Sequence, residues 1–252
     1  TKTSEGIFSS FGLWFDDKNV FWQNVQDTFA YQNGAYTRWL FNTIMYAVVA
    51  GVGATIIATF AGYAIATMRF PGRNALLAVT LAFMSIPSTV ITVPLFLMYS
   101  KIGLVGTPWA VIIPQLATPF GLYLMIIYAQ TSIPVSLIEA AKLDGASTWT
   151  IFWKVGFPLL SPGFVTVLLF TLVGVWNNYF LPLIMLSDTN DYPLTVGLNM
   201  WLKMGAQGTA NGQVPNNLII TGSLIAVVPL IIAFMFLQKY WQSGLAAGSV
   251  KQ

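Results

Sequence analysis

Five long stretches of this sequence contain no Asp, Glu, Lys or Arg, and this pattern constrains the fold more than any other feature. They are residues 40–68, 75–100, 109–129, 164–186 and 218–237. Each is long enough to cross the hydrocarbon core of a bilayer as a helix, which takes about 20 apolar residues. Backbone polar groups inside lipid must be satisfied within the segment, so a helix is expected for each stretch. The sequence therefore predicts an all-α, polytopic membrane protein with five visible spans.

Composition excludes several other classes of protein. Only 8% of the residues are charged, whereas soluble domains have about a quarter. Buried helices of a soluble protein would also give shorter apolar runs and charged faces. The 11 basic residues are scattered from one end of the chain to the other, which argues against nucleic-acid binding. The chain has no Cys and no His, so no catalytic or metal-binding residue is predicted.

The spans divide the chain into three parts. Residues 1–39 are rich in aromatic side chains and are expected to lie outside, at the lipid headgroups or against a partner, before the chain enters the membrane at Trp39. Residues 40–238 form the membrane domain, with a long cytoplasmic connection at 131–163 and an external loop at 187–217. Residues 239–252 form a cytoplasmic tail. This orientation follows a weak excess of Lys and Arg on the inner side, six against five.

The first span has small residues at every fourth position: Ala50, Ala54, Ala58, Gly62 and Ala66. Such a ladder lets another helix approach closely, either within the chain or in a second subunit. Prolines at 87, 94, 114, 119 and 229 interrupt the later spans. Prolines leave backbone groups that must be satisfied by protein or by a water-filled cavity, as is common along solute pathways, although kinked packing alone also explains them.

The polar residues inside the spans indicate how the protein is powered. The charge-free stretches contain no ionisable group, which argues against ion coupling. No Gly-Lys dipeptide is present, so the chain lacks a phosphate-binding P-loop and any ATP must be bound by a partner. The amides of Gln115, Asn177 and Asn178, with Trp176, are candidates for a neutral, sugar-sized pathway. Hydrogen bonding between helices is an equal alternative for these amides.

The connection at 131–163 contains clear helix signals. Ser136 and Glu139 have the spacing of a capping box, and Asp144-Gly145 is expected to end that helix. Ser147 can start a second short helix, whose end Pro158 and Pro162 would limit. Two short helices with large apolar side chains are typical either of an element at the lipid surface or of a knob for a partner's groove.

The same connection resembles the EAA loop of bacterial ABC importer permeases, whose pattern reads E-A-A, three residues, G, nine residues, I, one residue, L-P. Here the matching residues are Glu139, Ala140, Ala141, Gly145, Val155, Phe157 and Pro158. Val155 and Phe157 replace the usual Ile and Leu. The surrounding Asp144-Gly145-Ala146-Ser147 resembles the carbohydrate-uptake branch. The tail from Gly244 to Lys251 resembles the end of a maltose-type permease subunit.

The resemblance implies a type I permease fold, usually with six spans in this subunit, so the first span is expected upstream of the given residues. It implies a non-catalytic subunit in a bacterial inner membrane that forms half of a sugar or oligosaccharide pathway. It implies as partners a second permease subunit, two ATPase subunits that bind ATP and Mg, and an extracytoplasmic solute-binding protein. Residues implied in ATPase coupling are Glu139, Ala140, Ala141, Asp144, Gly145, Val155, Pro158, Gly248 and Lys251. Trp201, Gly205 and Gly208 are implied in contact with the binding protein.

Two alternatives stay open at this point. The chain resembles importers in general through the EAA loop, so a permease for another small solute fits the same residues. A self-sufficient secondary carrier or channel is the alternative from a different class, and it should show charges inside the spans or work without partners. Which solute is carried does not follow from the sequence.

Overall fold

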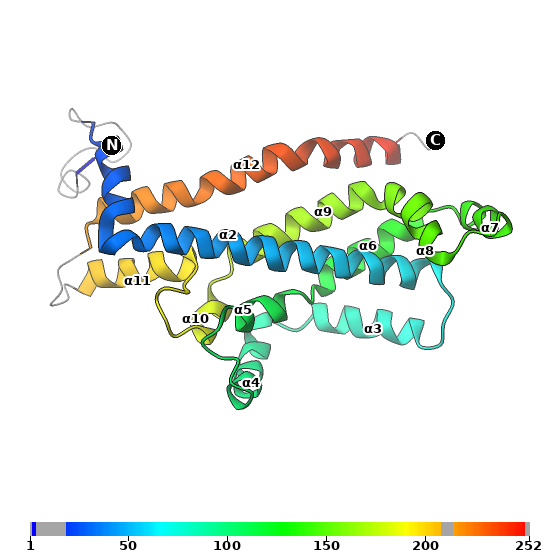
Figure 1. Cartoon of the computed structure of the whole chain (residues 1–252), viewed down its shortest axis with the longest axis horizontal. Coiled ribbons are helices and arrows are strands. Elements are labelled where there is room, and N and C mark those ends of the chain that lie inside the picture. Colours follow the sequence, from blue (N-terminus) through cyan, green and yellow to red (C-terminus); the bar gives the residue numbers. More distant parts are fainter. Residues whose placement is uncertain (1, 4–18, 208–213, 250–252) are drawn as a thin grey trace.

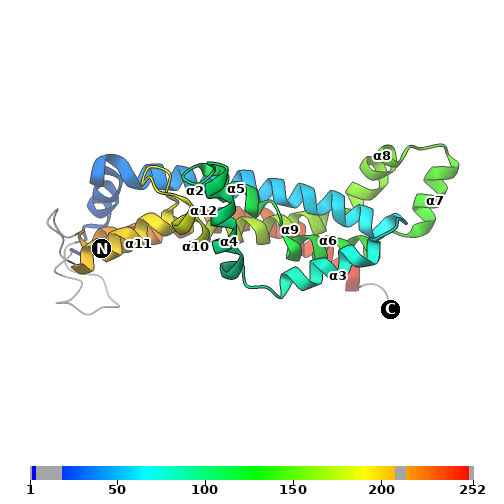
Figure 2. The same ribbon diagram turned by 90° about the horizontal axis from the view of Figure 1, so that it is seen from below.

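A computed structural model describes residues 2–3, 19–207 and 214–249. These residues form long helices that run side by side, with the two ends of the chain at opposite ends of an elongated molecule (Figures 1 and 2). The helices are α2 (Phe21–Thr67), α3 (Arg73–Met84), α4 (Ser88–Lys101), α5 (Pro108–Gln115), α6 (Pro119–Ser132), α7 (Val135–Leu143), α8 (Thr148–Ile151), the π-helix η1 (Phe152–Gly156), α9 (Phe157–Trp176), α10 (Phe180–Met185), α11 (Leu194–Gln207) and α12 (Asn216–Ser249). The expected all-α fold is confirmed.

Among the described residues, four helical segments are long and apolar enough to cross a membrane, Phe21–Thr67, Pro108–Ser132, Thr148–Trp176 and Asn216–Gln238, and the bent pair α3 and α4 makes up to a fifth span. The predicted second span differs, because α3 and α4 meet at a bend of 102°. The break falls at residues 85–87, where Pro87 caps α4. Proline lacks an N–H and disfavours helical backbone in the residue before it, so a straight helix cannot continue here.

The boundaries of the predicted fourth span, 164–186, were also wrong. The helix already begins at Thr148 and passes through η1 into α9, and it ends at Trp176. Lys154 made the first part look like a loop, but its side chain is exposed in the π-helical turn. Long basic side chains at span ends can reach the interface while the helix continues, so one Lys does not exclude helix. Residues 177–186 form a turn and the short helix α10.

Helix α2 is the centre of the bundle, and it packs against α6 and α9 along much of its length. Its small residues make this possible: a Cβ on Gly62 would lie 2.6 Å from the Cβ of Met125, and one on Gly51 would lie 3.0 Å from Leu172. Thr55 and Thr171 share a buried hydrogen bond of 3.0 Å between α2 and α9. Of the two alternatives for the small-residue ladder, the described residues thus show packing within the chain.

The N-terminal part of α2 is a separate arm. Residues Tyr31 to Gly34 leave helical geometry, with positive φ at Gln32, Asn33 and Gly34. Gly and Asn tolerate this left-handed conformation best, so the turn forms at Asn33-Gly34. Figure 1 shows the short arm before the turn standing across the long axis of the molecule. Within the part expected to be interfacial, Tyr36 and Trp39 are instead buried inside the chain, 0% and 1% exposed.

Candidate functional site

The predicted cytoplasmic connection forms a protruding element at one end of the bundle. Helix α7 extends beyond the ends of α2 and α9, and the C-terminal part of α12 lies toward the same end (Figures 1 and 2). The two predicted short helices are present as α7 and α8, with Gly145 between them at φ +76°. Ser147 starts α8 as expected, because its hydroxyl oxygen accepts a hydrogen bond from the backbone N–H of Thr150 at 3.2 Å.

The predicted capping box of Ser136 and Glu139 does not form. Helix α7 begins two residues earlier than expected, after Pro134, and no side chain caps it. Proline has a backbone angle suited to the helix entrance, so α7 starts without a hydroxyl cap, and Ser136 lies inside the first turn. Pro158 and Pro162 also do not end a helix, since Pro158 directly follows the π-helical turn η1 at the start of α9, and Pro162 lies inside α9.

Helix α7 ends in a Schellman motif, which explains the spacing of Ala141 and Gly145. The N–H of Gly145 donates to the carbonyl of Lys142, and the N–H of Ala146 donates to the carbonyl of Ala141, both at 3.0 Å. The motif needs a left-handed residue at the position of Gly145, where glycine costs least. It also favours an apolar contact between its two ends, and Ala141 and Ala146 both pack against the same buried cluster. The result is a sharply terminated, rigid knob.

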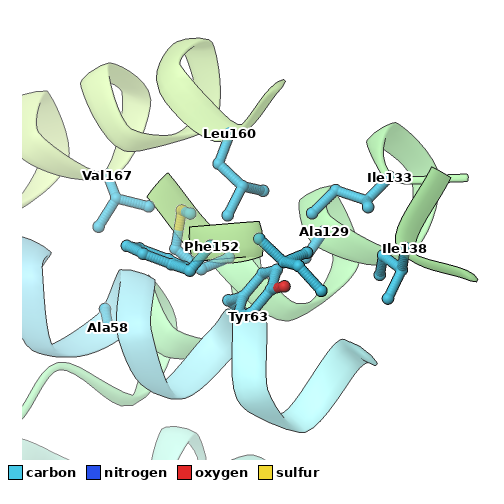
Figure 3. Close-up of a cluster of buried hydrophobic side chains, with 10 residues drawn as sticks. Ala58, Tyr63, Ala129, Ile133, Ile138, Phe152, Leu160 and Val167 are labelled. Atoms are coloured by element: carbon cyan, nitrogen blue, oxygen red, sulfur yellow. The ribbon is translucent and has the colours of Figure 1, made fainter. Parts of the chain in front are cut away.

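A buried cluster fixes the base of this knob to the spans. It joins Ile138 of α7 and Phe152 of η1 to Tyr63 of α2, Met125 of α6 and Leu160 of α9. Figure 3 shows the side chains of Leu160 and Val167 pointing from α9 toward Phe152 and Tyr63. Val155 packs at the edge of the cluster. Movement of α7 would therefore be passed to α2, α6 and α9 together.

The outer side of the knob carries the residues implied in coupling. Glu139, Ala140, Asp144 and Gly145 are exposed, and Leu143 is 89% exposed. Beside α7 lies a hollow of about 820 Å³, with Arg69, Arg73, Glu139 and Lys142 in its lining. Gly248 lies in the last turn of α12, and Lys251 lies outside the described residues. The knob thus presents small residues and free carboxylates to whatever binds it.

The comparison with protein families decides the identity of this arrangement. Residues 54–246 match the family "Binding-protein-dependent transport system inner membrane component". The chain belongs to this family. It is thus a permease subunit of a membrane transport system, with several membrane-spanning helices.

Known proteins agree with this assignment. The permease is 32% identical to the arabinooligosaccharides transport system permease protein AraQ of Halalkalibacterium halodurans, over 89% of this chain and 79% of that one. It is also 32% identical to the osmoprotective compounds uptake permease protein GgtD of Synechocystis, over 98% of this chain and 82% of the relative. A solved bacterial ABC transporter involved in alginate import superposes with a TM-score of 0.73 at 26% identity, over 89% of this chain and 80% of that one.

A second feature of the permease lies where its broken helices meet. The breaks α3/α4, α5/α6 and α9/α10 all contribute to a hollow of about 600 Å³, through Met84, Ile86, Ala117 and Phe180 among others. Gln115 and Asn178 also line it, and the Asn178 Nδ2 donates to the Gln115 Oε1 at 3.0 Å. A hydrogen bond between these amides, one of the two alternatives, is therefore present, and it joins the end of α5 to the turn after α9. Rings of Phe83, Phe120 and Phe180 complete the lining.

The other two residues predicted for the pathway lie elsewhere. Trp176 is only 8% exposed and belongs to a buried cluster with Trp39 and Trp201. Asn177 is exposed, and its side chain donates to the carbonyl of Val173 in its own helix. The adjacency of these residues in sequence was misleading, because α9 ends at Trp176 and the chain changes direction in the following turn. The phenylalanines of the hollow were missed, although they flank or lie near the prolines that mark the breaks.

The loop predicted to be external also corrects one prediction. Trp201 of α11 is 0% exposed, packs 4.9 Å from Trp39 between ring centroids, and donates from Nε1 to the Gln32 Oε1 at 2.9 Å. Its indole therefore holds α11 against α2 and cannot itself contact a binding protein. A Cβ on Gly205 would lie 3.1 Å from the carbonyl oxygen of Val214, so Gly205 permits a close backbone approach. Gly208 lies outside the described residues.

Proposed function

We propose that this permease is one of two permease subunits of an ATP-driven importer and forms half of the pathway for a sugar or oligosaccharide. The observation that carries the proposal is α7, a rigidly capped and exposed helix whose base is set in the core shared by α2, α6 and α9. Such an element can transmit a push from a bound partner to three helices at once. The names of the relatives support the substrate class, because AraQ carries arabinooligosaccharides in its name and a solved neighbour imports alginate.

In this proposal the ATPase subunits bind ATP and Mg, and this chain contributes no catalytic group. Glu139 offers its carboxylate to a basic side chain of the ATPase, and Asp144 adds a second negative charge at the turn. Ala140 has a short side chain, so the partner's groove can approach the backbone of α7 closely. Gly145 and Pro158 shape the two ends of the element. The C-terminal part of α12, with Gly248, lies toward the same end and would approach the same partner.

The orientation follows from this contact. ATP is cytoplasmic, so the α7 end of the bundle and the C-terminus are placed inside the cell, and α11 and the N-terminal arm are placed outside. The external face then meets a solute-binding protein, with the exposed side chains of α11, such as Leu202, available for contact. The apolar outer sides of α3 and α4 are left for the bilayer and the second permease subunit.

Glu139→Lys tests the coupling role. In complexes reconstituted in liposomes, we expect this change to leave assembly in the membrane intact and to abolish the ATPase stimulation caused by the loaded binding protein. The physical reason is that a cation replaces a carboxylate at the partner's basic groove. Ser136→Lys, which adds a positive charge to the same exposed helix, is the matched control and should retain stimulation. Normal stimulation in Glu139→Lys complexes, or solute flux through the chain alone, would refute the proposal.

Asn178→Ala tests the pathway role of the hollow. The solute would pass the amide pair and the phenylalanine rings, which suit hydroxyl groups and the apolar faces of a sugar. We expect Asn178→Ala to lower uptake about tenfold while ATPase stimulation by the loaded binding protein persists. Asn177→Ala, which removes a neighbouring amide bonded only within its own helix, should leave uptake unchanged. Equal uptake by the two variants would show that the amide pair takes no part in the pathway.

A further inference from the structure

The aromatic side chains of α8 and η1 form an exposed patch that the proposed ATPase contact does not use. Trp149 is 62% exposed and Trp153 is 44% exposed. Their rings pack with Phe60 of α2: Trp149 stacks on it at 5.7 Å with an interplanar angle of 3°, and Trp153 meets it edge-on at 6.1 Å. We call Phe60, Trp149 and Trp153 the aromatic patch.

The aromatic patch and α7 lie at different positions along the axis of α2. Phe60 precedes the end of α2 at Thr67 by seven residues, which corresponds to about 10 Å along the helix. Since both indoles pack on Phe60, they lie at the level of the last two turns of the span. Helix α7 lies further out, past the end of α2 (Figures 1 and 2). A groove that encloses α7 would have to reach back alongside the span to cover the patch.

The surroundings of the patch are those of a lipid-facing surface. On α2 the same side continues toward the membrane interior with Ile56, 41% exposed, and Val49, also 41% exposed. On the other side a ring ladder continues into α9, where Trp153 packs on Phe157 at 5.2 Å and Phe157 packs on Phe164 at 5.6 Å. The exposed Lys154 follows Trp153 directly. Tryptophan at the headgroup level with a neighbouring basic side chain is the composition of a membrane-interface belt.

We propose that the aromatic patch is a membrane anchor that seats α8 and η1 in the headgroup region of the cytoplasmic leaflet, while α7 alone serves as the knob for the ATPase. The two expectations for the 131–163 connection, a lipid-surface element and a knob for a partner, are then both met, each by a different helix. Anchoring at α8 holds the base of the knob at a fixed depth. The assignment to the cytoplasmic leaflet rests on the orientation in the proposed function, whereas the contact of the patch with lipid can be tested separately from the ATPase contact of α7.

Site-directed spin labelling of the permease subunits, before and after the ATPase subunits are added, tests the anchor. The chain has no native Cys, so single cysteines can be introduced without changes elsewhere in it. Nitroxide labels at Trp153→Cys and at Leu143→Cys are compared in nanodiscs of phosphatidylethanolamine and phosphatidylglycerol, with ATPase subunits free of reactive cysteine. We expect the label at 153 to be more accessible to oxygen, which concentrates in lipid, than to the water-soluble nickel chelate. The label at 143 should show the reverse accessibility before the ATPase subunits are added.

Adding the ATPase subunits shows whether lipid or protein covers the patch. We expect immobilisation at 143 and no change at 153. Preferential access of the nickel chelate to 153, or protection of 153 from both reagents, would overturn the anchor, because water or protein would then cover the patch. If only the label at 143 fails to become immobilised, the result would count against the coupling proposal and would not contradict the membrane anchor.

A second measurement needs no spin label and keeps an aromatic ring at each substituted position. In Trp153→Phe and Trp149→Phe complexes, quenching of tryptophan fluorescence by lipids brominated near the headgroup should fall relative to the unaltered chain. Trp201→Phe, which replaces a fully buried indole, is the control and should not reduce this quenching. Unchanged quenching in both patch variants would also overturn the anchor.

Discussion

At the scale of single residues, the backbone conformation of Gly145 predicts the effect of replacing it. Its φ of +76° is left-handed, and nothing lies within 4 Å of where a Cβ would be. Gly145→Ala therefore meets no steric clash, but it strains the Schellman turn by roughly 1–2 kcal/mol. We expect lower ATPase stimulation in reconstituted complexes carrying Gly145→Ala, with partial recovery in Gly145→Asn, because Asn tolerates this conformation.

Gly72 provides the matched control for this change. It has a φ of +89°, equally open surroundings, and a place in the turn between α2 and α3 at the same end of the bundle. Gly72→Ala should bear a similar backbone strain and keep its ATPase stimulation. If both alanine variants lose stimulation equally, the effect comes from general destabilisation and not from the shape of α7.

Residue-level chemistry was predictable where a local rule decides the conformation. The turn at Gly145 and the cap at Ser147 follow from such rules. The capping box at Ser136 failed because Pro134 starts the helix instead. The burial of Trp201 could not be predicted, since it depends on Trp39 and Tyr36, more than 150 positions away in the sequence.

At the scale of helices, close packing of α2 on α6 depends on Gly62. A Cβ there would lie 2.6 Å from the Met125 Cβ and 3.1 Å from its carbonyl carbon, so backbone would have to move. We expect Gly62→Ala to destabilise the purified protein by about 1–3 kcal/mol, seen as a lower melting temperature. Gly174→Ala, at a helical glycine of α9 with nothing within 4 Å, should be neutral or slightly stabilising. Equal melting temperatures would show that α2 and α6 are not in close contact.

The charge pattern predicted where the helices lie more accurately than it predicted where they begin and end. All five charge-free stretches correspond to helical segments. Transferring a charged side chain into lipid is energetically costly, so charged residues are rare in membrane-spanning helices. The pattern misplaced the start of the fourth segment, since an exposed Lys at a span end is tolerated. The breaks at Pro87 and Pro119 were signalled by the prolines, but their convergence on one hollow with Gln115 and Asn178 is a property of the folded bundle.

At the scale of the whole molecule, the bundle has two distinct ends. One carries α7, Gly145 and the aromatic patch, and the other carries α11 and the N-terminal arm (Figure 1). Between them, α2, α6 and α9 pack on one another and connect the base of α7 to the hollow at the helix breaks. This continuity is the physical basis for the claim that energy enters at α7 and acts on a pathway within the spans.

The most direct test of that claim is photocrosslinking from Leu143, the most exposed apolar residue of α7. A photoreactive phenylalanine analogue at this position, in cells that express the complete transporter, should crosslink to the ATPase subunit. The same probe at Leu202 on α11 should crosslink to the solute-binding protein and not to the ATPase. A probe at position 143 that never reaches the ATPase, or one at position 202 that does, would contradict the account.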